Sequence, residues 1–157
     1  IIKALNKFKG LAHRQEIIFS NKKILCVNDS KATSFEACFQ SLSNYNKIYW
    51  IVGGLPKQQD NFNLKKVKKR IVKAYLIGKN TSFFKNQIKN NLPFTTSNNL
   101  RNAIKNIYRD IKFEKRSKIT ILLSPAAASF DQFSNFEARG TYFKNLIIKR
   151  FKRNQNV

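Results

Sequence analysis

Ionisable, hydroxyl and small side chains occur together in three segments of this chain, in patterns that could bind a ligand: residues 28–33, 53–62 and 124–140. In the first segment the carboxylate of Asp29, the amine of Lys31 and the hydroxyl of Thr33 follow one another closely. A lysine beside the N-terminus of a helix can bind an anion. The alternative is an ordinary helix-capping turn in which Lys31 is solvated.

The second segment begins with Gly53 and Gly54 and continues to Lys57. Glycines let a backbone approach a ligand closely, and the amine of Lys57 could meet a carboxylate. Glycine pairs are also common in simple turns after strands. The segment is not a nucleotide-binding P-loop, because GxxxxGK[ST] occurs nowhere in the chain.

The third segment, SPAAASFDQFSNFEARG at residues 124–140, is the most unusual. Small residues, then Ser129 and spaced phenylalanines, are typical of a tight loop whose hydroxyl and amides face a small polar ligand. The alternative is an ordinary helix start packed into a core. It would use Ser134 or Asn135 as the cap and Phe133, Phe136 and Phe143 as core residues.

Strands and helices alternate in the elements that must position these segments. Apolar and β-branched runs predict strands at residues 16–20, 23–27, 48–52, 74–77, near 94 and 119–123. Helical spacing predicts helices at about residues 35–45 and 100–111. Between the strands we also expect helices at about 62–70 and 82–90, with a last helix after Ser134 or Asn135. We expect Thr33 or Ser34 to cap the first of these helices and Ser97 to cap the one at 100–111.

This alternation predicts an α/β fold, a Rossmann-like open and mostly parallel sheet with helices on both faces and an N-terminal antiparallel hairpin strand. Ligands bind such sheets outside the carboxyl ends of the strands, where all three segments should meet. We expect residues 1–157 to form one domain, with 1–10 as a linker or helix from a preceding domain. Because the chain starts at Ile1 and contains no Met, we expect it to be a fragment of a longer protein.

The net charge of +23 raises another possibility, a basic nucleic-acid-binding module. Lys and Arg are nevertheless spread over every segment, with only short concentrations at residues 65–70 and 149–153. They accompany many Asn and Ile residues, which favours a compositional bias on solvated faces. No apolar run approaches the ~20 residues of a membrane span and no signal peptide is recognisable, so we expect a cytoplasmic protein. Cys26 and Cys38 are expected to be reduced and buried.

In order and separation, these segments resemble one branch of the Mur ligase family, in the C-terminal domain of the members that add D-glutamate. The matching motifs are GLAHR at 10–14, NDSKAT at 28–33, Gly53-Gly54 with Lys57 and DNF at 60–62, and LLSPAAASFDQFSNFEARG from Leu122. They span nearly the whole chain, and the last is the most specific because other Mur ligases have different loops there. The sequence departs from the family pattern at Ala12, where Pro is common, and at Ala127, where Cys is common. Phe130 stands where the family has Phe or Leu.

The resemblance implies an ATP-dependent ligase of peptidoglycan and cell-wall synthesis that joins D-glutamate to UDP-MurNAc-L-alanine through an acyl phosphate. It assigns the D-glutamate carboxylates to Thr33, Lys57, Ser129, the backbone at Phe130, and Phe136. It assigns ATP to His13, Arg14, Asp29 and Lys31. Lys31 would also lie near the reaction site, as the possible catalytic residue of this domain.

The rest of the machinery that the resemblance implies is not in this sequence. The P-loop, the carboxylates for Mg²⁺ and the UDP-binding domain would belong to preceding domains, so no metal ligand is expected here. The isolated fragment is therefore expected to be inactive, and this domain contributes positioning. A degenerate or stand-alone homologue without a ligase partner is a third possibility.

Overall fold

The computed structural model describes residues 11–114 and 117–151; residues 1–10, which include the predicted linker, lie outside the described part. Within it, one six-stranded sheet has the order β1-β2-β6-β3-β4-β5. The strands are β1 (Glu16–Ser20), β2 (Ile24–Asn28), β3 (Ile48–Gly53), β4 (Ile71–Ile77), β5 (Phe94–Asn98) and β6 (Ile119–Leu123). Only β1 is antiparallel to its neighbour among these strands. The predicted α/β fold is confirmed.

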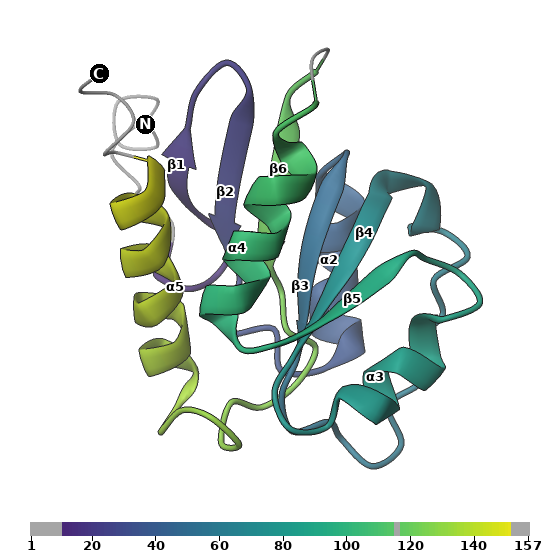
Figure 1. The fold of residues 1–157 in the computed structure, drawn as a ribbon. Helices are drawn as coiled ribbons and strands as arrows, with labels where there is room; N and C mark the ends of the chain where they lie inside the picture. The colour runs from purple at the N-terminus through teal and green to yellow at the C-terminus, as the bar shows by residue number, and fades with distance from the viewer. Residues whose placement is uncertain (1–10, 115–116, 152–157) are drawn as a thin grey trace, which may run out of the picture.

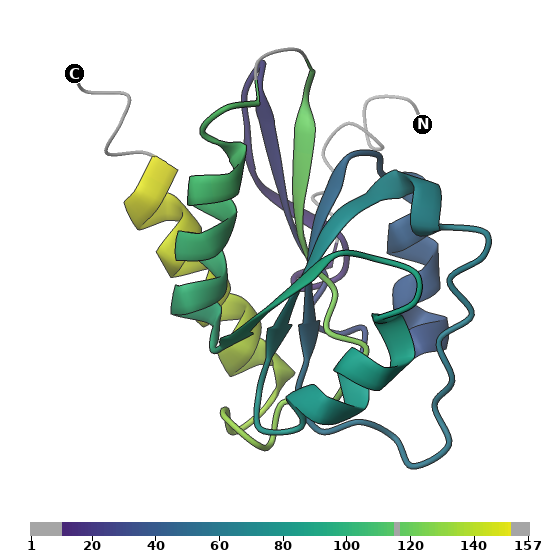
Figure 2. The same ribbon diagram turned by 45° about the vertical axis from the view of Figure 1, so that its right-hand side comes forward.

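Helices cover both faces of the sheet (Figures 1 and 2). Helices α2 (Phe35–Asn44) and α3 (Thr81–Ile88) pack on one face, and α4 (Leu100–Ile111) and α5 (Phe136–Phe151) on the other. The central strand β3 shows why two cores form. Trp50 and Val52 face the α2 and α3 side, whereas Tyr49 and Ile51 face the α4 and α5 side, because side chains alternate along a strand.

The predicted helix at residues 62–70 was wrong. The chain there is irregular and ends in a single turn of 3₁₀ helix, η1 (Lys68–Arg70). Phe62, Leu64 and Val67 are the buried residues, and this spacing does not form one face of an α-helix. Residues 62–70 contain five cationic side chains and no carboxylate, which gives an α-helix no favourable ion pairs.

The predicted cap of α4 was also wrong, because β5 continues past Ser97. Asn99 caps the helix, and its side-chain oxygen accepts a hydrogen bond from the Asn102 amide at 2.9 Å. Ser97 is buried in the strand and accepts from the side chain of Asn106 at 3.0 Å. Two residues, Thr33 and Ser34, were predicted as alternative caps of α2. Ser34 is the cap, and its hydroxyl accepts a hydrogen bond from the Ala37 amide.

The structure also bears on the two cysteines and on membrane-spanning helices. Cys26 and Cys38 are free and buried, as predicted, and burial raises the pKa of both thiols. Within residues 11–114 and 117–151, no helix is long and apolar enough to cross a membrane.

Candidate functional site

The three predicted segments meet at one edge of the sheet, because they follow β2, β6 and β3, which are adjacent strands. Backbone hydrogen bonds join them there. The Asp29 amide donates to the Leu123 carbonyl at 2.7 Å, and the Gly53 amide donates to the Pro125 carbonyl at 2.9 Å. The sequence prediction that these segments converge is therefore confirmed by the strand order.

The loop after β6 has a backbone with an unusual polarity. Its carbonyls at Ala127, Ala128 and Ser129 all accept hydrogen bonds from protein donors, namely Arg139, Leu55 and the Gln132 and Phe133 amides. In the described part of the chain, the amides of Ser129 and Phe130 have no hydrogen-bond partner. A loop whose carbonyls are already hydrogen-bonded and whose amides have no partner favours the binding of an anion.

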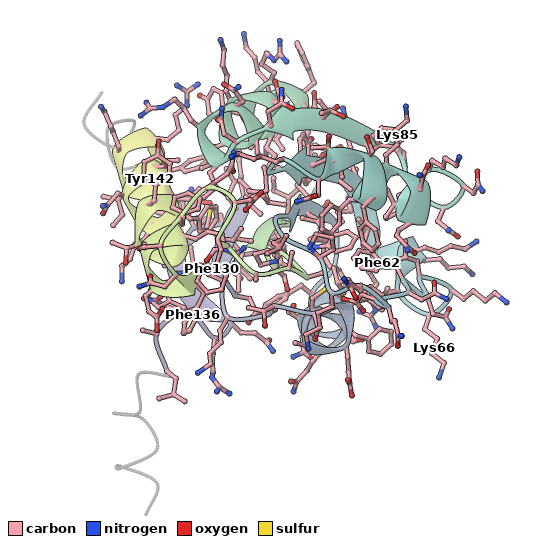
Figure 3. The ribbon with its side chains drawn as sticks, turned by 90° about the horizontal axis from the view of Figure 1, so that it is seen from below. Phe62, Lys66, Lys85, Phe130, Phe136 and Tyr142 are labelled. Carbon is pink, nitrogen blue, oxygen red and sulfur yellow. The ribbon has the colours of Figure 1, made fainter. Side chains whose placement is uncertain are left out.

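Ser129 lies in this loop with 2% of its surface exposed. No group in residues 11–114 and 117–151 forms a hydrogen bond with its hydroxyl. Phe130 is 68% exposed beside it, whereas Phe136 is half-buried at the start of α5. In Figure 3, which views the molecule from this edge, Phe130 and Phe136 lie at the end next to α5.

The Lys31 ammonium lies over the ring of Phe136, 5.1 Å from its centroid. This distance is within the range of a cation–π interaction. The pair brings together one residue predicted for ATP and one predicted for D-glutamate. Asn135, the second of the two caps considered, accepts from the Ala138 amide at 2.7 Å and starts the helix that holds Phe136.

Asp29 is buried, and its two carboxylate oxygens are used differently. Oδ1 accepts from the Gln15 amide at 3.2 Å, and Oδ2 accepts from the Ser124 hydroxyl at 2.9 Å. The Ser41 hydroxyl in turn donates to Ser124 at 3.0 Å. Burial raises the pKa of Asp29, although these hydrogen bonds and the charge of Arg14 oppose the shift.

Three of the four residues predicted for ATP line one open pocket of about 350 Å³. Its lining residues are Arg14, Gln15, Asp29, Lys31, Ala32, Ala37 and Gln40. His13, the fourth, has a different environment. Its Nδ1 lies 2.9 Å from the side-chain nitrogen of Asn28, and its ring packs edge-on against Phe136 at 6.2 Å. A Cβ atom on Gly140 would clash with this ring.

Thr33 and Lys57 lie on loops that are joined to each other. The Phe35 amide donates to Oδ2 of Asp60 at 2.8 Å, which links the start of α2 to the loop after β3. Thr33 is half-buried and Lys57 is exposed. Lys57 has no carboxylate within 4.0 Å among the described residues, so its charge is available to a ligand.

Sequence reasoning missed the importance of Arg139, which is buried between these loops and donates to Ser30 and Ala127. A signal was available. A cation in the first turn of a helix opposes the helix dipole, so Arg139 needed another reason to be there. The described residues contain no group of three or more His, Cys, Asp or Glu side chains that could hold a metal ion.

Comparisons with known proteins identify the family to which the chain belongs. No protein-family model matches the chain. The UDP-N-acetylmuramoylalanine--D-glutamate ligase of Rhizobium meliloti (strain 1021) is 41% identical over 143 residues, which are 91% of this chain and 31% of that protein. The enzyme of the same name from Mesorhizobium japonicum is 43% identical over 140 residues, 89% of this chain and 30% of the relative.

A third relative, from Wolbachia sp. subsp. Brugia malayi, has the same name and is 41% identical over 149 residues, 95% of this chain and 30% of the relative. The chain thus spans about a third of the length of these relatives, in their C-terminal portion. On this identity over nearly its whole length, the chain belongs to the UDP-N-acetylmuramoylalanine--D-glutamate ligase family.

Proposed function

We propose that residues 1–157 form the D-glutamate-binding and ATP-contacting C-terminal domain of a cytoplasmic ligase. That ligase would use ATP to add D-glutamate to UDP-MurNAc-L-alanine in peptidoglycan synthesis. The observation that carries the proposal is the loop after β6, where the amides of Ser129 and Phe130 have no partner among the described residues while the carbonyls of residues 127–129 are bonded to protein donors. Such a loop suits a carboxylate, because it lies at an edge where Lys31 and Lys57 have no carboxylate within 4.0 Å among the described residues.

D-glutamate has two carboxylates and therefore needs donors at two places. The amide of Phe130 and the hydroxyl and amide of Ser129 would bind one of them, with Phe136 as an apolar wall. Thr33 and the charge of Lys57 would bind the other. The role of these groups is to hold the amine of D-glutamate at the acyl phosphate, so their contribution is orientation.

The ATP side of the proposal uses the pocket of about 350 Å³. Arg14 and Asp29 would contact the ribose of the nucleotide, and His13 would support this end by its packing against Phe136. Lys31 would face the phosphates and the reacting centre, where its charge would stabilise charge that develops during transfer. Mg²⁺ would be held mainly by residues of the preceding domains.

The proposed partners are these small molecules and the ATPase and UDP-binding domains of the same protein. Positioning groups alone cannot activate a carboxylate, so the isolated chain would not catalyse ligation. The site would form fully only when the domains close on the substrates. A stand-alone homologue would keep the amino-acid loop and lack this activity.

The nucleic-acid-binding alternative has no comparable support. Its basic stretch at residues 65–70 is irregular and exposes lysines, as any solvated cationic surface would. The second stretch, 149–153, lies partly outside the described residues. The relatives' printed names are those of ligases.

The proposal is tested in the full-length protein by D-glutamate-dependent release of ADP. Lys57→Ala should raise the KM for D-glutamate by roughly 30- to 700-fold, equivalent to about 2 to 4 kcal/mol, and leave the KM for ATP unchanged. Lys85→Ala is the matched control, because Lys85 is an exposed lysine on α3. Absence of D-glutamate-dependent ADP release in the wild type would refute the function. An unchanged KM in Lys57→Ala would refute the role of Lys57.

A further inference from the structure

Arg139 joins separate parts of the proposed site through one buried side chain, of which 1% is exposed. Its Nε donates to the Ser30 hydroxyl at 3.0 Å, and its Nη2 donates to the carbonyls of Ser30 at 2.8 Å and Ala127 at 3.0 Å. The guanidinium therefore ties the loop after β2 to the loop after β6. It also occupies the Ala127 carbonyl, two residues before Ser129, as a hydrogen-bond acceptor.

The remaining donor nitrogen of this side chain, Nη1, has a different environment. Nη1 of Arg139 is buried and has no hydrogen-bond partner among the described residues. It points toward the Gly53-Gly54 turn, since a Cβ atom built on Gly54 would lie 3.3 Å from it. Buried donors without partners are rare in proteins, so one that lies between the three loops of the proposed site indicates a use.

The charge of Arg139 also lacks a close counter-ion. No carboxylate lies within 4.0 Å of the guanidinium among residues 11–114 and 117–151. Asp131 is near enough to favour the charged form, but its Oδ2 accepts from the Lys79 amide at 2.9 Å. Burial lowers the pKa of Arg139 to about 10, so the side chain stays cationic at neutral pH.

We propose that Arg139 is a positioning residue that selects an amino acid with two carboxylates, by placing a positive charge without a contacting carboxylate against Ala127, in the loop that carries Ser129 and Phe130. The inference rests on the proposed function and deepens it. A buried cation is stabilised when an anion binds nearby, and the low polarity of the interior strengthens that attraction. In this arrangement the Ser129 and Phe130 loop binds the side-chain carboxylate, so D-glutamine, which lacks that carboxylate, would leave the charge uncompensated. The selectivity thus comes from a group that need not touch the ligand.

The test uses the full-length protein and compares D-glutamate with D-glutamine, which has the same shape but lacks the side-chain charge. Arg139→Gln should raise the KM for D-glutamate about tenfold or more while the KM for ATP stays within about twofold. The ratio of kcat/KM for D-glutamate over D-glutamine should fall by a similar factor. Arg139→Lys keeps the charge without the planar fork, so it should retain most of this preference.

Arg150→Gln is the matched control, because it removes the same charge from an exposed position on the same helix. Equal losses in Arg139→Gln and Arg139→Lys, with an unchanged preference for D-glutamate, would show a purely structural role and overturn the inference. If Arg139→Gln does not fold, loss of the preference in a folded Arg139→Lys also overturns it. A wild type without D-glutamate-dependent ADP release would instead overturn the proposed function and this inference together.

Discussion

The Lys31 ammonium and the Phe136 ring, 5.1 Å apart, come from different loops and form a direct contact between the two halves of the proposed site. Lys31 follows β2, whereas Phe136 is the first residue of α5. The Lys31 amide is fixed as well, because it donates to the His13 carbonyl at 3.1 Å. The ammonium is thus oriented before any ligand binds, which reduces the entropy lost on binding.

Phe136→Leu keeps an apolar side chain and removes the ring face under Lys31. A cation–π contact contributes about 0.5 to 2 kcal/mol, so kcat/KM for D-glutamate in the full-length protein should fall by roughly 2- to 30-fold. Phe113→Leu is the control, since Phe113 is exposed just beyond α4. Steady-state kinetics measure both variants. Unchanged kinetics in Phe136→Leu would mean that the ring does not orient Lys31.

The fold was predictable because burial on both faces of a sheet leaves a local pattern in the sequence. The runs IYWIV and ITILL became β3 and β6, which are buried throughout. The position of the three ligand segments was predictable for the same reason, since each follows such a run. The strand order β2-β6-β3 was not visible locally, because it depends on pairings such as Asn28 with Leu123 that are distant in sequence.

The errors have physical causes too. A helix was expected at residues 62–70, yet Phe62, Leu64 and Val67 are buried there from a stretch that is irregular up to its final 3₁₀ turn. Arg139 was overlooked because arginines are usually exposed, and its acceptors on Ser30 and Ala127 come from segments that only the tertiary structure brings together. The local hydrophobic pattern of a sequence predicts helices and strands. Buried polar contacts between loops, such as those of Arg139, are visible only in the tertiary structure.

Asp29→Asn should gain stability relative to the wild type as the pH rises from about 4 to 7. Burial raises the pKa of Asp29, so the ionised carboxylate costs stability that is recovered when the group is protonated. Asn has one acceptor oxygen where Asp29 uses two, which adds a cost that does not vary with pH. The melting temperature of the variant minus that of the wild type should therefore rise from about pH 4, where aspartates are protonated in both states, to about pH 7. Thermal unfolding across this pH range is the measurement, and a difference that falls as the pH rises would contradict the argument.

Asp110→Asn should have the opposite effect. Burial acts to raise the pKa of Asp110, but hydrogen bonds from Lys73 at 2.8 Å and Tyr75 at 2.6 Å outweigh it and hold the pKa below its usual value. Because its pKa is lowered in the folded state, ionised Asp110 stabilises the fold at pH values above the usual pKa of aspartate. That contribution to the free energy of unfolding is lost as the pH falls through the lowered pKa. The variant should melt a few degrees lower at about pH 7 and like the wild type in acid. Equal melting temperatures throughout would show that the contacts are neutral.

Gly54→Ala tests whether the loop after β6 must approach the turn after β3 this closely. Gly54 has φ of 140°, and a Cβ atom there would clash with the Ala128 carbonyl oxygen, which accepts from the Leu55 amide at 2.8 Å. The variant should lose roughly 1 to 3 kcal/mol of stability, measured by chemical denaturation. It should also raise the KM for D-glutamate, because moving Ala128 displaces the amides of Ser129 and Phe130. Asn145→Ala, at an exposed position on α5, is the control, and a Gly54→Ala protein with unchanged stability and KM would show that the loop does not depend on this contact.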